Sequence, residues 1–485
     1  MLRRLSSLGL SIALTLTGCA TNPVTGGRDF VLMSEEQEIE LGRDFHPRML
    51  EQTPVYENEA VQQRVKEIGQ RLAENSHRSD LDYTFTVLDS PDVNAFALPG
   101  GYVYITRGIM AYFNSEAELA GVLGHEIGHV TARHGVQRHS AETASSLLGA
   151  LLIAGTGAGA GAAELFQTAQ LAAIRGYGRE QELQADRLGA EYLARSGYDS
   201  EEMLDVVGVL ADQEQYAMQQ ARDEGREPSG YHGLFSTHPE NDARLQEVVR
   251  AARKHQAENP RTASRAEYVR LIEGMPFGPS ADQGTVVAHQ FLHLGLDASV
   301  QAPRGWTIVN QPQRLIFQGP DDAAMLVATI GQAEGQPARE LLAERLDGAE
   351  TSDARTIDVG PYDGFTAVTM ARTQIGPRQL RHVVIRKGEH AWFFTGLARE
   401  RGAMREFDDD FLEIATSLDR LAPAQRKQAQ PLEIVGYDPE SGDTYEALAE
   451  PVADRLDDAV AQLRLLNGDW PDGQPEPGHP IKLLR

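Results

Sequence analysis

The sequence predicts an α+β protein in which a mainly helical region with a small sheet is followed by an α/β sandwich-like domain and a small C-terminal module. Three observations predict this fold class. Apolar side chains recur at helical spacing in residues 34–42, 55–75 and 178–196. Between residues 265 and 421, short segments alternate apolar and polar side chains as strands do. The length of 485 residues is sufficient for roughly two to four domains.

Residues 1–18 have the features of an export signal, because two arginines precede an apolar run at residues 8–16. The next residue, Cys19, is the only cysteine, so no disulfide can form within the chain. A lone cysteine is often a small buried side chain, but the sequence Leu-Thr-Gly-Cys resembles a bacterial lipobox, which predicts lipidation of Cys19. Acyl chains would anchor the protein to a membrane with its body in water. Ala20 follows, and similarity to enterobacterial sorting rules then indicates the periplasmic face of the outer membrane.

The first elements after this signal are predicted as two amphipathic helices, at residues 34–42 and 55–75. Residues 83–88 and 102–106 alternate like strands and predict a small sheet. Mostly helix follows, to about residue 256. This order predicts a short sheet beside a helical body.

The pentapeptide His125-Glu126-Ile127-Gly128-His129 lies in one of these predicted helices, which Ser115 and Glu118 begin with a capping box. Two histidines four residues apart share one face of a helix, where each can bind zinc at about 2.0–2.1 Å. Glu126 points about 100° round the helix and can accept a proton from a water that zinc activates. One helical turn therefore supplies two metal ligands and a general base.

A third ligand is needed, because catalytic zinc takes three from the protein. The predicted helix at residues 178–196 offers Glu182 as a ligand and, one turn later, Asp186. Asp186 can accept a hydrogen bond from the far nitrogen of a ligating histidine and so fix its tautomer. Alone, these acids would be typical of a solvated helix face. Together with the histidine pair they predict one Zn²⁺ per chain.

Four blocks of the first half of the chain resemble the M48 zinc metallopeptidases, especially their bacterial lipoprotein branch. The blocks are Asn94–Gly101, His125–His134, Glu182–Asp186, and Ser236–Pro239 with Arg244. The resemblance implies a gluzincin-like peptidase domain at residues 19–260. It also implies roles for particular residues: zinc ligands at His125, His129 and Glu182, the catalytic base at Glu126, and a strand for extended peptide substrate after Asn94, Ala95, Phe96 and Ala97.

His238 and Arg244 have more than one interpretation. The turn Thr237-His238-Pro239 is typical of a helix end, whereas the family resemblance implies a place near the metal. There His238 would stabilise the oxyanion of the reaction or occupy the open zinc position and hold the enzyme latent. Arg244 would bind substrate or form an ion pair with an acid such as Glu240.

The net charge of −26 disfavours nucleic acid and anionic lipid headgroups as partners. Residues 145–163 are apolar and rich in glycine and alanine. They are too short and interrupted for a typical membrane span of about 20 residues. A packed helix that ends in a glycine loop and a lid that moves or dips into the membrane are both compatible with this composition.

Residues 265–421 predict a twisted antiparallel sheet with a closing helix at 407–421, loosely similar to the α/β sandwich of small photosystem-accessory proteins. His382 and His390 in this region are predicted to be structural strand residues. Binding or scaffolding is the expected role. A linker at residues 423–431, rich in Ala, Gln and Lys, ends the domain.

Residues 432–485 resemble a degenerate LysM module, a family that binds peptidoglycan. The resemblance lies in Gly442-Asp443 and Asn467-Gly468, which are also common turns. A plain dimerisation or packing module is the alternative. No 34-residue helical repeat is visible in the sequence.

These patterns predict a zinc endopeptidase, and the family resemblance implies that its substrates are misfolded or misassembled envelope proteins. The alternative is an envelope assembly factor or chaperone whose proteolytic activity is latent.

Overall fold

The computed structural model describes residues 19–141, 178–223, 242–257, 260–261, 264–373 and 375–485. The predicted export signal, the apolar segment at 145–163 and His238 lie outside these residues. The described chain divides into two compact units. The first unit comprises described residues within 1–50, 55–88 and 92–271, and the second comprises 51–54, 89–91 and described residues within 272–485.

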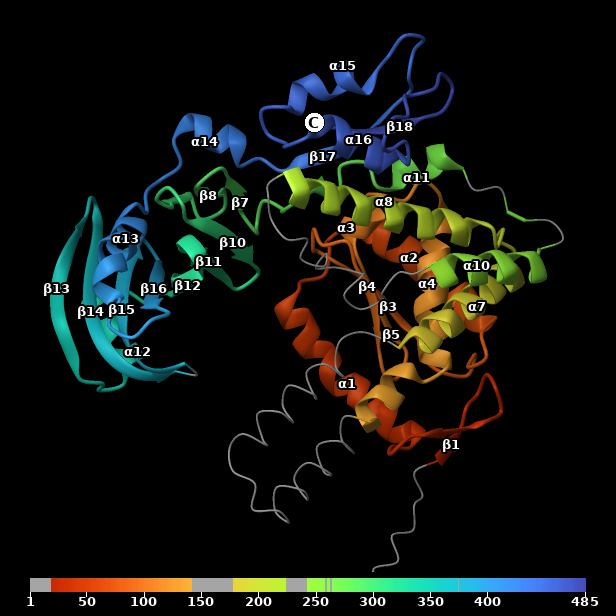
Figure 1. The fold of residues 1–485 in the computed structure, drawn as a ribbon, viewed down its shortest axis with the longest axis horizontal. Coiled ribbons are helices and arrows are strands. Elements are labelled where there is room, and N and C mark those ends of the chain that lie inside the picture. Colours follow the sequence, from red (N-terminus) through yellow and green to blue (C-terminus); the bar gives the residue numbers. More distant parts are fainter. Residues whose placement is uncertain (1–18, 142–177, 224–241, 258–259, 262–263, 374) are drawn as a thin grey trace, which may run out of the picture. The chain divides into compact units, whose positions relative to one another are not determined.

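The first unit is mainly helical, with five short strands among its described residues (Figure 1). The strands are β1 (Cys19–Thr21), β2 (Arg28–Phe30), β3 (Thr84–Leu88), β4 (Ala95–Leu98) and β5 (Tyr102–Thr106). The helices are α1 (Glu35–Gln52), α2 (Glu59–Glu74), α3 (Arg107–Met110), α4 (Glu116–Thr131), α7 (Arg179–Arg195), α8 (Glu202–Asp223), α10 (Asp242–Lys254) and α11 (Arg265–Leu271).

Helix α4 is the centre of this unit, and every residue from Ala117 to Thr131 is buried. It contacts α2, α7 and α8 and also the three-stranded sheet β3-β5-β4. Its start is capped by Ser115, whose hydroxyl accepts a hydrogen bond from the amide of Glu118 at 3.0 Å. The carboxylate of Glu118 accepts from the amide of Asn114 at 3.0 Å, one residue before the position that a capping box would use. The buried helix therefore begins at a well-defined place.

The second unit begins with β6 (Pro276–Phe277) and is rich in strands. Three short strands, β7 (Thr285–Val287), β8 (Gln290–His293) and β9 (Ala298–Gln301), form an antiparallel sheet. A seven-stranded antiparallel sheet follows, with the order β10-β11-β12-β16-β15-β14-β13. Its strands are β10 (Thr307–Gln311), β11 (Arg314–Gln318), β12 (Ala324–Gln332), β13 (Thr351–Val359), β14 (Tyr362–Thr373), β15 (Gly376–Lys387) and β16 (His390–Ala398).

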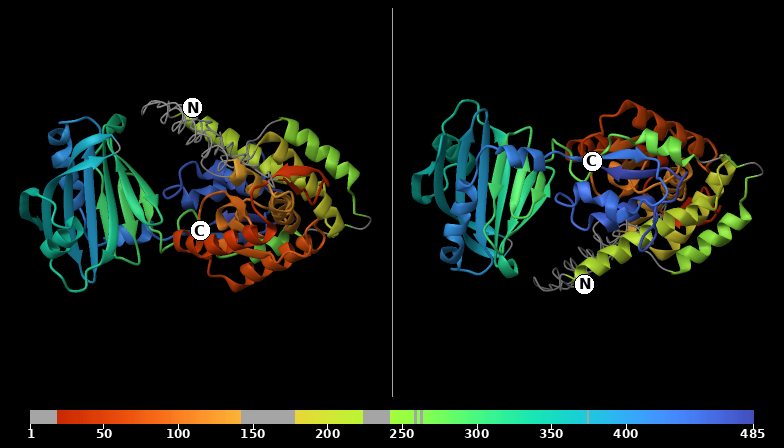
Figure 2. Two further views of the ribbon diagram at one scale, coloured as in Figure 1. Left: turned by 90° about the horizontal axis from the view of Figure 1, so that it is seen from below. Right: turned by 90° about the horizontal axis from the view of Figure 1, so that it is seen from above.

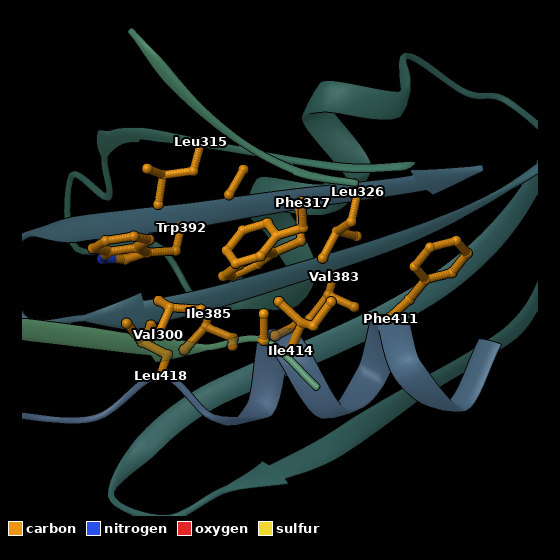
Figure 3. Close-up of a cluster of buried hydrophobic side chains, with 14 of the residues drawn as sticks. Val300, Leu315, Phe317, Leu326, Val383, Ile385, Trp392, Phe411, Ile414 and Leu418 are labelled. Carbon is orange, nitrogen blue, oxygen red and sulfur yellow. The ribbon is translucent and has the colours of Figure 1, made fainter. Parts of the chain in front are cut away.

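Helices cover opposite faces of the seven-stranded sheet, whose strands lie side by side in both views of Figure 2. On one face, Phe411 and Ile414 of α13 (Met404–Thr416) pack with Val383 and Ile385 (Figure 3). On the other face, α12 (Ala338–Leu346) packs against Val384. Because successive side chains of a strand point to opposite faces, β15 contributes to both cores. A strand that is buried on both faces is a near-continuous apolar run, as Val383 to Ile385 is.

The end of the second unit contains α14 (Pro423–Gln428), β17 (Leu432–Tyr437), α15 (Tyr445–Ala449), α16 (Ala459–Asn467) and β18 (Ile481–Leu484). Strands β17 and β18 pair antiparallel, and β6 pairs with the other edge of β17. Two short 3₁₀ turns complete the unit, at Pro320–Asp322 and Glu450–Val452.

The predicted α+β class is confirmed, and the structure adds elements that periodicity did not indicate. Strand β13 is mostly exposed, because it is an edge of the sheet and needs little apolar patterning. The predicted linker at 423–431 contains helix α14, which starts with Pro423. Proline suits the first helical position, since its missing N–H would have no partner there.

Candidate metal centre

Helices α4 and α7 pack against each other (Figure 1), and their backbones come close together. Three glycines and an alanine make this possible. A Cβ atom at Gly128 would lie 3.0 Å from the carbonyl oxygen of Ala185, and one at Gly124 would lie 3.3 Å from that of Gly189. A Cβ atom at Gly189 would lie 3.1 Å from the amide nitrogen of His125. Residues with larger side chains would hold the two helices apart, so these positions bring the side chains of α4 and α7 together.

Three buried side chains converge between the two helices in an arrangement that could hold a metal ion: His125, His129 and Glu182. The Nε2 atoms of the two histidines lie 3.0 Å apart. The Glu182 carboxylate oxygens lie 3.6 Å from Nε2 of His125 and 3.5 Å from Nε2 of His129. Zinc–nitrogen bonds of about 2.0–2.1 Å in a tetrahedron separate neighbouring ligand atoms by about 3.3 Å. The residues present therefore fit a tetrahedral zinc ion with a fourth position left for another group.

Asp186 lies on the far side of His125, where its Oδ1 is 2.9 Å from the Nδ1 atom of that ring. Burial alone would lower the pKa of His125, but hydrogen bonds and charges from Asp186 and Glu182 outweigh it and raise the pKa to about 10. Asp186 and Glu182 therefore favour the protonated ring when no metal is bound, and metal binding releases such a proton.

Glu126 is fully buried on α4. Strand β4, which contains the predicted substrate residues Ala95, Phe96 and Ala97, contacts this helix. Within the described sheet, β4 is an edge strand, because it pairs only with β5. Ala97 and His129 line one small hollow. The structure therefore brings an edge of the described sheet to the side of the histidine pair, and Asn94 directly precedes that strand.

His134 is a further buried residue of this centre, and its role was not predicted from the sequence. Its Nδ1 atom lies 2.8 Å from Nδ1 of His129, and its Nε2 atom lies 3.1 Å from Oε1 of Gln184. Burial lowers the pKa of His134 to about 4, so the ring is neutral at neutral pH. The one feature of the sequence that points to His134 is its closeness to the histidine pair, because it follows His129 by five residues.

Other predicted residues lie away from this geometry or outside it. Arg244 is in the first turn of α10, and its side chain is not among those described. Cys19 begins β1 and is paired with Phe30 of β2. No helix within the described ranges is long and apolar enough to cross a membrane.

Part of the chain that contains this centre is similar to known proteins. Residues 59–252 match the model of peptidase family M48. The beta-barrel assembly-enhancing protease of Yersinia pestis is 31% identical over 245 residues, which are 49% of this chain and 48% of that protein. The mitochondrial metalloendopeptidase OMA1 of Arabidopsis thaliana is 31% identical over 146 residues, which are 30% of this chain and 29% of that protein. The matches thus span less than half of either relative.

Among solved structures, that of cyanobacterial PsbP from Synechocystis sp. PCC 6803 is aligned over 28% of this chain and 96% of its own. Its sequence identity of 13% and TM-score of 0.23 are too low to support an assignment. The family match, by contrast, includes both histidines, Glu126 and Glu182. Residues 59–252 therefore form a peptidase family M48 domain.

Proposed function

We propose that this protein is a zinc-dependent endopeptidase in which His125, His129 and Glu182 bind the zinc ion. The convergence of their ligand atoms at 3.0–3.6 Å between α4 and α7 is the observation that carries the proposal. Two imidazoles and one carboxylate are a donor set that catalytic zinc uses. When bound there, zinc would polarise a peptide carbonyl and lower the pKa of a water.

In this mechanism Glu126 is the general base. It accepts a proton from the attacking water and passes it to the leaving nitrogen of the peptide. Glu126 directly follows His125 on the buried helix α4, and the turn of about 100° between them leaves its carboxylate able to reach a water at the site. Asp186 holds the ring of His125 by its Nδ1 atom.

The peptide substrate would bind as an extended strand along the free edge of β4, beside the histidine pair. Main-chain hydrogen bonds to a strand edge recognise peptides largely independently of their side chains. This suits a protease with unfolded proteins as substrates. Misfolded or misassembled envelope proteins are the substrate class that we propose, and the name of the Yersinia relative, a beta-barrel assembly-enhancing protease, supports proteins of beta-barrel assembly among them.

A second candidate rests on the same name, since it refers to assembly as well as to proteolysis. In that case the protein is an assembly factor or chaperone, and His238 keeps the peptidase latent. In the endopeptidase, His238 instead stabilises the oxyanion, and Arg244 binds substrate.

Lipidation of Cys19 would place the protein in the periplasm, on the outer membrane. Fractionation of cells that express Cys19→Ala tests this anchor. Loss of the protein from the membrane fraction supports it, and retention there argues against it.

Peptidoglycan is the proposed partner of residues 432–485. The resemblance of their turns to a LysM module supports this partner, and β17 and β18, the first and last strands of this range, pair with each other. Co-sedimentation with purified peptidoglycan, comparing the full chain with a chain that ends at residue 431, tests it. Equal sedimentation of the two proteins would rule out peptidoglycan binding by residues 432–485.

The main test uses the protein from Ala20 onward, with zinc content and cleavage of unfolded casein as readouts. We expect one equivalent of zinc and cleavage by the wild-type protein. Glu126→Gln should keep the zinc and lose about 10²–10⁴-fold in kcat/KM, because only the base is removed. Full activity of a zinc-loaded Glu126→Gln protein would contradict the assignment.

His238→Ala separates the two candidates, because it should lower cleavage by an endopeptidase that uses His238 to stabilise the oxyanion. Zinc without cleavage in the wild-type protein, with activity gained in His238→Ala, indicates a latent peptidase. If neither protein cleaves casein although both bind zinc, the assembly-factor function is favoured.

A further inference from the structure

We infer that His134 and Gln184 are positioning residues that fix the tautomer of His129 and thereby set the affinity of the site for zinc. This inference rests on the proposed zinc site. It starts from the two short contacts of the His134 ring, to His129 on one side and to Gln184 on the other.

The direction of the hydrogen bonds follows from the atoms involved. The Oε1 atom of Gln184 is a carbonyl oxygen, which only accepts, so the Nε2 atom of His134 carries the proton of that ring. A neutral imidazole has one protonated nitrogen, and Nδ1 of His134 is therefore an acceptor. His129, 2.8 Å away, must donate from its own Nδ1 atom.

This arrangement decides which nitrogen of His129 can bind a metal. With the proton on Nδ1, the lone pair of His129 is on Nε2, the atom that lies 3.0 Å from Nε2 of His125. The opposite tautomer would present an N–H to the metal ion. Outer hydrogen-bond partners of this kind typically change metal affinity by about 10–100-fold when they are removed.

The two histidine ligands thus have different outer partners. Asp186 faces Nδ1 of His125 with a carboxylate, whereas a neutral imidazole backed by an amide faces His129.

The fold places His134 by a turn directly after α4. Arg133 has a left-handed backbone with φ of 58°, which is unusual for a residue other than glycine. Its side chain donates from Nε to the buried carboxylate of Glu38 at 2.8 Å. The turn brings the His134 ring to a centroid distance of 4.9 Å from His129, edge to face at 70°.

The test compares His134→Leu with His134→Asn. Asparagine has an oxygen where histidine has Nδ1, so it can still accept from His129, whereas leucine has the same branched shape without an acceptor. We expect the zinc dissociation constant, measured by chelator competition at pH 7, to rise about 10–100-fold in His134→Leu. In His134→Asn it should stay within about threefold of wild type. Equal affinities of His134→Leu and wild type, or equal losses in both variants, would overturn the inference.

Gln184 offers a second test that does not alter the buried ring, because its side chain is only half-buried. Gln184→Met should weaken zinc binding by less than His134→Leu does, since the tautomer of His134 is then no longer held. Gln70→Met is the matched control: Gln70 is a half-buried glutamine of α2 whose amide donates to the carbonyl of Tyr83 at 2.9 Å. Equal zinc affinities of these two variants would contradict a role for Gln184.

Failure of this inference can be distinguished from failure of the proposed function. If wild-type protein binds no zinc, the metal site itself is wrong. If wild-type protein binds one equivalent and His134→Leu binds it equally well, the zinc site stands and only the role of His134 falls.

Discussion

His382 is a buried histidine of β15 with hydroxyl groups on both sides of its ring. Its Nε2 atom is 2.9 Å from the Thr369 hydroxyl, and its Nδ1 atom is 3.3 Å from that of Thr395. Burial, and to a smaller extent the charges of Arg345 and Arg381, lowers its pKa to about 4. These contacts agree with the structural role that the sequence suggested for it.

This depressed pKa predicts acid sensitivity of the second unit. The unfolded chain binds the proton at an ordinary histidine pKa of about 6.5, whereas the folded unit binds it only near 4. The stability of the folded unit is therefore complete above about pH 6.5 and falls as the pH drops toward 4, by up to about 3 kcal/mol. Urea unfolding of wild type and His382→Gln between pH 4 and 7 measures this loss of unfolding free energy. The same pH dependence of the unfolding free energy in both proteins would exclude His382 as its cause. His390→Gln is the control, because His390 lies at the half-exposed start of β16, and it should keep the pH dependence of wild type.

At the scale of helices, a change from glycine to alanine should have opposite effects on stability at two positions. One position is Gly208 on the open side of α8, and the other is Gly189 between α4 and α7. Alanine usually stabilises a helix relative to glycine, by about 1 kcal/mol. At Gly208 of α8 nothing lies within 4 Å of an added Cβ, so Gly208→Ala should raise the free energy of unfolding by up to that amount. At Gly189 the added atom would meet the backbone of His125 at 3.1 Å.

Gly189→Ala should therefore lower stability and also weaken zinc binding, because the separated helices carry the metal ligands. Overpacking of this kind typically costs about 1–3 kcal/mol. Thermal unfolding of the metal-free proteins and chelator competition for zinc measure the two effects. A stabilised Gly189→Ala protein would show that the helices can separate without cost.

Glu38 of α1 links three segments of the first unit. Its carboxylate accepts from Arg78 at 2.8 Å and from Arg133 at 2.8 Å, and all three side chains are buried. Arg78 also donates to the carbonyl of Val130, near the end of α4. The cluster therefore ties α1 to the turn that carries His134.

Loss of the Glu38 charge should be strongly destabilising, because the buried Arg133 would lose its carboxylate partner and Arg78 would retain its ion pair with the exposed Glu35 alone among the ion pairs described. Glu38→Gln is expected to cost about 3–5 kcal/mol in the free energy of unfolding. Glu40→Gln, at an exposed position of the same helix, should change it by less than about 0.5 kcal/mol. Urea titrations of the two variants provide the comparison, and similar values would mean that the cluster contributes little.

For the whole molecule, the distribution of tryptophan separates the two units by spectroscopy. All three tryptophans, Trp306, Trp392 and Trp470, are in the second unit. The proposed zinc ligands and most of the long helices are in the first unit. Tryptophan fluorescence therefore reports on the second unit, and circular dichroism at 222 nm is weighted to the first.

Removal of zinc should lower the stability of the first unit alone. A metal at about 100 times its Kd stabilises the folded state by about 2.7 kcal/mol, which corresponds to a Tm shift of roughly 5–10 °C. We expect EDTA to shift the 222 nm transition downward and to leave the fluorescence transition in place. A shift of both transitions, or of neither, would contradict this expectation.

Much of the metal centre could be predicted from the sequence, because its key spacing lies within one helix. His125, Glu126 and His129 are held by the geometry of a single turn, and local spacing determines which side chains share a face. Glu182 was predicted from the need for a third ligand, and the structure brings it to the histidine pair. The α+β class was predicted from periodicity, although the exposed edge strand β13 lacks the apolar pattern on which such predictions depend.

The tertiary structure decided what depends on contacts between distant residues. The approach of α4 to α7 requires glycines on both helices to face each other, which periodicity does not reveal. The place of His134 depends on a left-handed turn at Arg133, held by Glu38, a residue 95 positions earlier in the chain. Spacing along a helix is local and can be predicted from the sequence, whereas these contacts form only when separate segments pack into one core.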